Sequence, residues 1–177
     1  QEVTNVIASA EATRESLRTI FFQGVIETTD EAKREFTFLA ALQSQPNVGW
    51  VAFAWPDGDF FGAEKRGEHG IAMVEVREEG EEEKTRQRRV DTYVAEPGDI
   101  VFKERVFVPS AFRSTDYDWY RKAVETKGPV WVDAEEFPTR RRPAIANAAP
   151  ELRKSLLVFI ACLSSDSRTE RARPCLE

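Results

Sequence analysis

The sequence predicts an α+β domain, in which a long N-terminal helix and a second helix precede an antiparallel β-sheet flanked by helices. Two observations support this fold class. Apolar residues recur at helical spacing through residues 3–27 without an interrupting proline. From residue 48 onward the pattern changes to short apolar runs bounded by turn residues, and strands joined by short hairpins pair antiparallel. With 177 residues, of which 41% are hydrophobic, the chain fits one domain with its own core.

The first 45 residues are predicted to form the two helices. The apolar stripe of the first helix, residues 3–27, consists of Val3, Val6, Ile7, Ala10, Leu17, Ile20 and Phe21. The second helix, residues 30–44, has two candidate caps, because Thr28 and Glu31 have the spacing of a capping box and Asp30 is an alternative N-cap. Pro46 ends this helix, since proline cannot continue it.

The sheet is predicted from residue 48 onward. Residues 48–55 are apolar on both alternating faces, which is typical of a strand covered on both sides. The sequence Pro-Asp-Gly-Asp at 56–59 is a strong turn signal, and Phe60 begins the returning strand. The remaining expected elements are strands at 71–77, 85–94 and 100–108, a short helix at 116–126, and strand-like segments at 130–132, 143–149 and 156–163.

The charge of the chain argues against one class of partner. A net charge of −6 and a pI of about 5.1 disfavour nucleic-acid binding, which needs a cationic surface to displace counterions from phosphates. We therefore expect no nucleic-acid partner. No apolar run reaches the roughly 18–20 residues that cross a bilayer, so a membrane anchor is expected outside this sequence. Arg86, Arg88 and Arg89 follow an acidic run at 78–83, and we expect both groups on the solvated surface.

The sequence offers little catalytic machinery. His69 is the only histidine and lies in a glycine-flanked loop, which excludes most schemes that use histidine as a base or metal ligand. No glycine-rich loop precedes a helix as phosphate binding requires, and we expect no cofactor and no metal ion. Asp133 and Glu135 remain an alternative as a hydrolytic carboxylate pair. Cys162 and Cys175 lack the spacing of a zinc site, and a bridge between them stays open.

Two motifs follow one another along the chain. The first is Gln-Pro-Asn-Val-Gly-Trp-Val at 45–51, leading into Trp-Pro-Asp-Gly-Asp-Phe-Phe at 55–61. The second is Asp-Trp-Tyr-Arg-Lys-Ala at 118–123, followed by Gly-Pro-Val-Trp-Val-Asp at 128–133. They resemble the Cache family of bacterial extracytoplasmic sensor domains, specifically the membrane-distal half of double-Cache domains. With a matching later strand at 143–150, the resemblance covers about residues 1–150.

The resemblance implies a PAS-like sensor domain that is not itself an enzyme. In such receptors a small-molecule ligand binds between the sheet and the short helix and loops around it. The N-terminal helix relays the change to a cytoplasmic cyclase, kinase or chemotaxis output, with an adenylate or guanylate cyclase favoured. The resemblance also implies a homodimer through the N-terminal helix and a periplasmic location in a membrane-anchored inner-membrane protein. The expected organisation is a helical stalk at 1–45, the sensor domain at 46–163 and a polar tail at 164–177.

The expected ligand-binding residues are Tyr117, Trp119, Tyr120, Trp131, Asp133 and Arg105. From spacing alone the aromatic residues are either core or the wall of a pocket. Family members that bind amino acids carry an arginine where this chain has Tyr117, so a standard amino acid is not the expected ligand. A carboxylate or a polyamine is an alternative. Two other functions stay open: a ligand-free dimerisation module, and a hydrolase built on Asp133 and Glu135.

Overall fold

The computed structural model describes residues 2–79, 85–134, 144–151 and 157–163. Its helices are α1 (Glu2–Phe22), α2 (Glu31–Ser44), the 3-10 turn η1 (Ser114–Asp116) and α3 (Asp118–Thr126). Its strands are β1 (Val48–Ala54), β2 (Phe60–Arg66), β3 (Gly70–Glu79), β4 (Thr85–Glu96), β5 (Asp99–Pro109), β6 (Val130–Ala134), β7 (Ala144–Glu151) and β8 (Leu157–Leu163). Each helix and strand that the sequence predicts is therefore present, and apart from the end of the first helix the bounds agree within a few residues.

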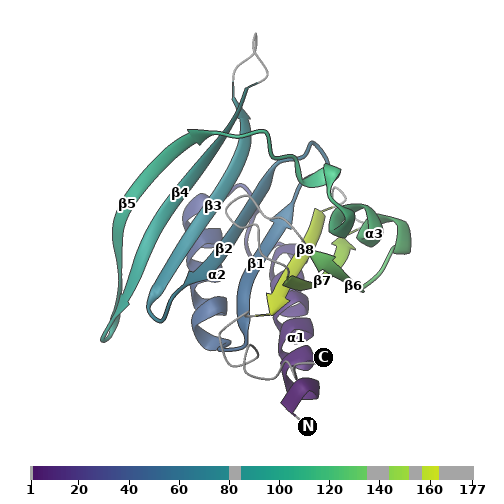
Figure 1. Ribbon diagram of the computed structural model, residues 1–177, viewed down its shortest axis with the longest axis horizontal. Coiled ribbons are helices and arrows are strands. Elements are labelled where there is room, and N and C mark those ends of the chain that lie inside the picture. Colours follow the sequence, from purple (N-terminus) through teal and green to yellow (C-terminus); the bar gives the residue numbers. More distant parts are fainter. Residues whose placement is uncertain (1, 80–84, 135–143, 152–156, 164–177) are drawn as a thin grey trace, which may run out of the picture.

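The strands form one sheet in the order β5-β4-β3-β2-β1-β8-β7-β6, and each neighbouring pair runs antiparallel. Helices α1 and α2 cover one face of this sheet, and α3 covers the other face at the β6–β8 end (Figure 1). We refer to these as the α1–α2 face and the α3 face. The predicted α+β fold, with a helical N-terminus followed by an antiparallel sheet flanked by helices, is confirmed.

Strand β1 is buried on both faces because each face of the central sheet carries its own core. Trp50 and Ala52 point into the core of the α3 face, whereas Val51 and Phe53 point into the core of the α1–α2 face. On the latter face Phe53 packs edge-to-face on Phe38 of α2, with ring centroids 5.6 Å apart. The prediction of a strand covered on both sides is confirmed.

Helix α1 ends five residues before its predicted end, so the prediction of a helix to residue 27 is wrong. Gly24 takes a left-handed conformation with φ of 70°. Its N–H donates to the carbonyl of Phe21 at 3.2 Å, and the N–H of Val25 donates to the carbonyl of Ile20 at 3.2 Å. This pair of bonds is a Schellman motif, which ends the helix and satisfies its last carbonyls.

Helix α2 begins after Asp30, the second of its two candidate caps. The Asp30 carboxylate accepts a hydrogen bond from the backbone N–H of Lys33 at 3.2 Å. Both helices pack on the sheet, where Leu17 of α1 and Phe38 and Leu42 of α2 belong to one core. The division into a stalk at 1–45 and a sensor domain at 46–163 stays a prediction.

Some expectations concern residues outside the described part of the chain. Glu135, Cys175 and the tail at 164–177 lie outside it, and so do the side chains of Asp133 and Cys162. The polar tail therefore stays a prediction, and the hydrolytic pair and the cysteine bridge stay open. Among the described helices, none combines the length and the apolar character needed to cross a bilayer.

Candidate functional site

Helix α3 presents an aromatic cluster to the sheet. Trp119 is 1% exposed and packs against Phe60 of β2, with ring centroids 6.3 Å apart. Tyr117 stacks on Trp119 at 6.4 Å and on Phe112 at 4.8 Å. Burial raises the pKa of Tyr120, so its hydroxyl stays protonated. Trp119 and Tyr120 are thus core residues, whereas Tyr117 is half-buried at the margin of the stack.

The turn between β1 and β2 is fastened to the segment that leads into α3. The carbonyl of Gly58 accepts the N–H of Ser114 at 3.1 Å, and the carbonyl of Asp59 accepts the Ser114 hydroxyl at 3.1 Å. Arg86 of β4 also binds the turn. It donates to the carbonyls of Asp57 at 2.8 Å and Gly58 at 3.1 Å, and pairs with the Asp59 carboxylate at 3.0 Å. The turn motif and the aromatic motif are therefore adjacent in space.

We expect Gly58→Ala to lower the free energy of unfolding by about 1–3 kcal/mol. Gly58 has φ of 93°, and an added Cβ would lie 3.2 Å from Nη2 of Arg86. Gly98→Ala is the matched control, because Gly98 has φ of 83° and nothing lies within 4 Å of its added Cβ. Chemical denaturation of both variants separates crowding from backbone strain. Equal losses would mean that the approach of Arg86 adds nothing.

The α3 face of the sheet is exposed at its outer strand and closed toward its middle. Val106 of β5 is exposed, Val90 opposite it on β4 is half-buried, and Val74 opposite Val90 on β3 is fully buried. Arg88 and Thr92 lie on the same side of β4 as Val90, because alternate residues share a face, and both are half-buried. We call these five residues the β-floor. It is an apolar surface with polar groups on β4, and it is exposed toward β5.

The six predicted ligand-binding residues do not lie together. Trp131 packs into the core of the α1–α2 face, and its indole N–H donates to Glu11 of α1 at 3.0 Å. Arg105 also lies on that face, where it binds both carboxylate oxygens of Asp91 at 2.7 and 2.8 Å. Asp133 is placed in β6, with its side chain outside the described part. The three aromatic residues at the start of α3 are the ones that the structure brings together.

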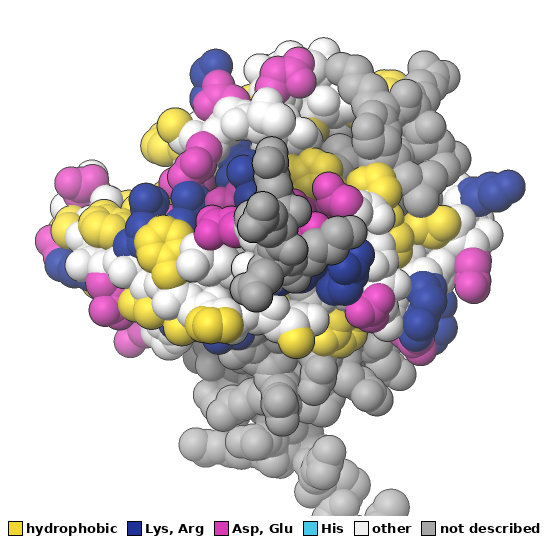
Figure 2. Space-filling model, turned by 90° about the horizontal axis from the view of Figure 1, so that it is seen from above, with side chains coloured by type: hydrophobic (Ala, Val, Ile, Leu, Met, Phe, Trp, Pro, Cys, Tyr) yellow, Lys and Arg dark blue, Asp and Glu magenta, His cyan; other side chains and the backbone are white. Residues whose placement is uncertain are grey.

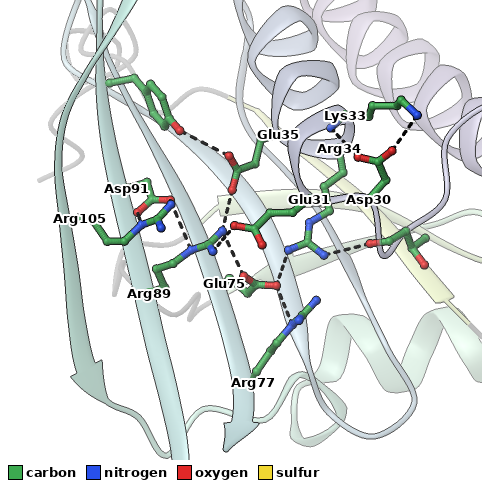
Figure 3. A network of polar contacts seen from close by, with 12 residues as sticks. Asp30, Glu31, Lys33, Arg34, Glu35, Glu75, Arg77, Arg89, Asp91 and Arg105 are labelled. Carbon is green, nitrogen blue, oxygen red and sulfur yellow. Dashed lines mark hydrogen bonds and ion pairs between the residues drawn. The ribbon is translucent and has the colours of Figure 1, made fainter.

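The α1–α2 face carries an ionic network between α2 and strands β3–β5 (Figure 3). Arg34 of α2 is 0% exposed, pairs with Glu75 of β3 and donates to the carbonyl of Thr28 at 2.9 Å. Its guanidinium lies 4.3 Å from the ring centroid of Phe61, a cation–π distance. Arg77 gives Glu75 a second cation, with an N–O distance of 2.7 Å. A charge pair inside the core therefore joins α2 to β3.

Arg89 of β4 is the hub of this network. Its guanidinium contacts four carboxylates, those of Glu31, of Glu35 at 2.6 Å, of Glu75 at 3.2 Å and of Asp91 at 3.3 Å. A guanidinium has five N–H donors in a rigid plane, so one arginine can serve acids on several elements. Arg89 thereby connects two acids on α2 with one on β3 and one on its own strand.

Burial shifts the pKa values of groups in this network. It raises the pKa of Glu35 above that of an ordinary glutamate, Arg89 opposes the rise, and Asp91 and Glu31 add to it. Burial also raises the pKa of Tyr93 to about 12, with the charge of Glu35 adding. The Tyr93 hydroxyl, 3.5 Å from the Glu35 carboxylate, therefore stays protonated. For Glu31, burial acts to raise the pKa, but the hydrogen bond and charge of Arg89 bring it below the ordinary value.

The expectation of a solvated arginine cluster is wrong for two of its three members. Arg86 is buried against the turn, and Arg89 is mostly buried at the centre of the network. The sequence does contain a signal for the network. Arg89, Asp91 and Tyr93 alternate along β4, so they share one face and need partners there. The opposite charges on α2 lie more than 50 residues away, and only the tertiary fold brings them together.

Hydrophobic side chains are exposed along the outer strand β5. Phe102 is 49% and Phe107 52% exposed. Figure 2 shows hydrophobic side chains spread over the β5 side of the molecule, at the left, among acidic and basic ones. Lys103, Glu104 and Arg105 interrupt the apolar positions, and charges on an outer strand limit pairing with other chains.

No protein-family model matches the sequence, and no curated protein matches it. The fold is similar to that of the ligand-binding domain of the Campylobacter jejuni chemoreceptor Tlp3, whose structure was solved in complex with 4-methylisoleucine. The similarity covers 93% of this chain and 51% of that chain, with a TM-score of 0.51 and 11% sequence identity. This chain therefore spans about half the length of that protein, and at this identity the likeness shows a common fold.

Proposed function

We propose that this chain is the extracytoplasmic ligand-sensing domain of a transmembrane receptor. The observation that carries the proposal is the fold, which is shared with a chemoreceptor ligand-binding domain over 93% of the chain. The Cache-like motifs at the turn and at α3 add support, because hydrogen bonds join these two regions in space. The domain itself is proposed to bind a ligand and not to catalyse a reaction.

We propose the β-floor, whose Val74 shares a core with the aromatic residues of α3, as the ligand-binding surface. Val90 and Val106 offer apolar contact, and Arg88, Thr92 and the half-buried Tyr117 offer polar groups. A binding site of this kind combines an apolar lining with a few placed polar groups. Trp119 and Tyr120 support the surface from the core and need not touch the ligand. A small molecule with both an apolar body and polar ends fits this composition best.

Strand β4 is the proposed link between the ligand site and the helices. Val90 and Thr92 belong to the β-floor, whereas Arg89 and Asp91 face α2 on the other side of the sheet. A ligand that moves β4 therefore also acts on α2, and through it on α1. We propose that α1 forms a homodimer and leads toward a membrane anchor, with the domain in the periplasm. The proposed output is a cyclase, kinase or chemotaxis domain, and this chain would be one half of a double-Cache unit.

A thermal-shift screen of small polar metabolites tests the ligand proposal. At a ligand concentration of 100 Kd the domain gains about 2.7 kcal/mol, which corresponds to a rise in Tm of about 5–11 °C for a domain of this size. Amino acids, carboxylates and polyamines are the classes to include. If no class raises Tm and the protein is a stable dimer in sedimentation, the ligand-free dimerisation module becomes the better explanation.

Two variants on neighbouring positions of β4 locate the site. Thr92→Val removes a hydroxyl from the β-floor, and Tyr93→Phe removes one from the α1–α2 face. We expect Thr92→Val to weaken ligand binding several-fold, as measured by calorimetry, and Tyr93→Phe to leave it unchanged. Loss of binding in Tyr93→Phe alone would place the ligand on the other face and overturn the proposed site.

A further inference from the structure

Among the buried acids of the ionic network, Glu35 is the least compensated. Glu75 contacts Arg34 and Arg77 in addition to Arg89. Asp91 contacts Arg105 as well as the hub arginine. Among the described residues, Glu35 has Arg89 as its cation, which it shares with three other carboxylates, and Tyr93 as a weak donor at 3.5 Å. Positive charge at this point of the network is therefore divided among more acids than it can fully pair.

Water compensates Glu35 less than it compensates Glu31. The side chain of Glu35 is 14% exposed, whereas that of Glu31, one turn earlier on the same helix, is 48% exposed. A buried carboxylate that is incompletely paired is costly, and it lowers that cost by binding a proton. The charged or titratable groups of the network around Glu35 are Glu31 and Arg34 on α2, Glu75 and Arg77 on β3, Arg89, Asp91 and Tyr93 on β4, and Arg105 on β5.

We propose that this network responds to protons, and that uptake of one proton by Glu35 tightens the docking of α2 on the sheet under mildly acidic conditions. A neutral Glu35 still accepts a hydrogen bond from Arg89. Its protonation leaves the guanidinium of Arg89 to three acids instead of four. The response requires no ligand and is separate from binding at the β-floor. It gives the domain a second input, the acidity of its surroundings.

The direction of the response follows from the two glutamates of α2. The pKa of Glu35 is raised by burial, so its contribution to stability is full below the pKa of the unfolded chain and is lost as pH rises through the folded pKa. The pKa of Glu31 is lowered, so its contribution is present above the unfolded pKa and is lost as pH falls through the folded pKa. As pH falls from neutral toward the pKa of an ordinary glutamate, the proton on Glu35 therefore dominates. At lower pH, loss of the Glu31 ion pair reverses the trend.

Glu35→Gln tests the proposal, because glutamine keeps the hydrogen-bonding shape and does not titrate. In the wild-type protein we expect Tm to rise as pH falls from 7.5 to 5.5, and the α2 amides to exchange hydrogen more slowly after correction for intrinsic rates. Each unit by which the Glu35 pKa is raised corresponds to up to about a tenfold change in protection. In Glu35→Gln we expect both profiles to be flat in this range, with a Tm above wild type at pH 7.5.

Glu31→Gln is the matched control on the same helix. Loss of the Glu31 charge removes one minor cause of the raised Glu35 pKa, so the rise between pH 7.5 and 5.5 should become smaller but remain. A wild-type profile that persists in Glu35→Gln, or that vanishes in Glu31→Gln instead, would overturn the proposal. A carboxyl-carbon NMR titration of the wild-type protein gives an independent test that requires no variant. The Glu35 resonance should titrate at higher pH than those of exposed glutamates, and a midpoint among theirs would also overturn it. The results of the pH experiments do not depend on whether the proposed ligand site is correct.

Discussion

Arg34→Ala is expected to lower the free energy of unfolding by about 3–5 kcal/mol, as measured by chemical denaturation. Arg34 is 0% exposed, and its partner Glu75 is 6% exposed. Removing one member of a buried pair leaves the other charge in the core with too little compensation. The variant also loses the packing of the guanidinium on Phe61 and its bond to the carbonyl of Thr28. Arg77 and Arg89 remain near Glu75 and limit the loss.

Lys33→Ala is the control for this prediction. Lys33 precedes Arg34 on α2 and pairs with Asp30, but its side chain is 67% exposed. Exposed pairs contribute little because solvent screens them. The loss should therefore be several times smaller than for Arg34→Ala. Similar losses in the two variants would mean that the buried pair does not determine the effect, because alanine is a better helix former than either residue.

Trp119→Ala is expected to cost about 3–5 kcal/mol of unfolding free energy. The Trp119 indole is almost fully buried between α3 and the sheet, where it contacts Phe60, Tyr117 and Tyr120. Its removal leaves a cavity that the rigid sheet cannot close, and a cavity adds to the lost apolar burial. Thermal and chemical unfolding both report this loss.

Trp131→Ala is the control of the same residue type. Trp131 is half-buried on the α1–α2 face and bonds to Glu11 at the surface of α1. It should cost clearly less than Trp119→Ala. A loss for Trp119→Ala below that of Trp131→Ala would contradict its assignment to the core. Because Trp119→Ala damages the fold, a ligand response lost in that variant says nothing about contact with the ligand.

The order of helices and strands was predictable because it depends on local patterns. The turn at 56–59 contains Gly58 with φ of 93°, a conformation that glycine adopts at no steric cost. The N-cap of α2, Asp30, was one of the two candidate caps predicted from the sequence. The predicted end of the first helix, at residue 27, is too late. Apolar residues continue to Ile26, although Gly24 has already ended the helix. Glycine at that position was the available signal.

The candidate site was less predictable because it depends on which face of the sheet each residue meets. Trp131 is close to Trp119 in sequence, but alternation along β6 turns it toward α1. Arg105 was expected near a ligand, and the register of β4 with β5 places it opposite Asp91, on the other face from the aromatic residues of α3. Arg89 was assigned to the surface because its acids on α2 are far away in sequence. Strand register and helix docking are non-local, and no short motif encodes them.

The buried pair between Arg34 and Glu75 also has a consequence for how this protein diverges in evolution. The two residues are 41 positions apart in the sequence. A homologue that has lost only one of them keeps an unpaired buried charge and is strongly destabilised. An apolar pair of similar volume can replace a buried ion pair with little loss of stability. Homologues should therefore either keep both charges or lack both, and a pair of substitutions at these positions should mark a branch that no longer relies on the network. Such covariation would identify homologues that keep the docking of α2 on the sheet, even where the sequence motifs of the turn and of α3 are no longer recognisable.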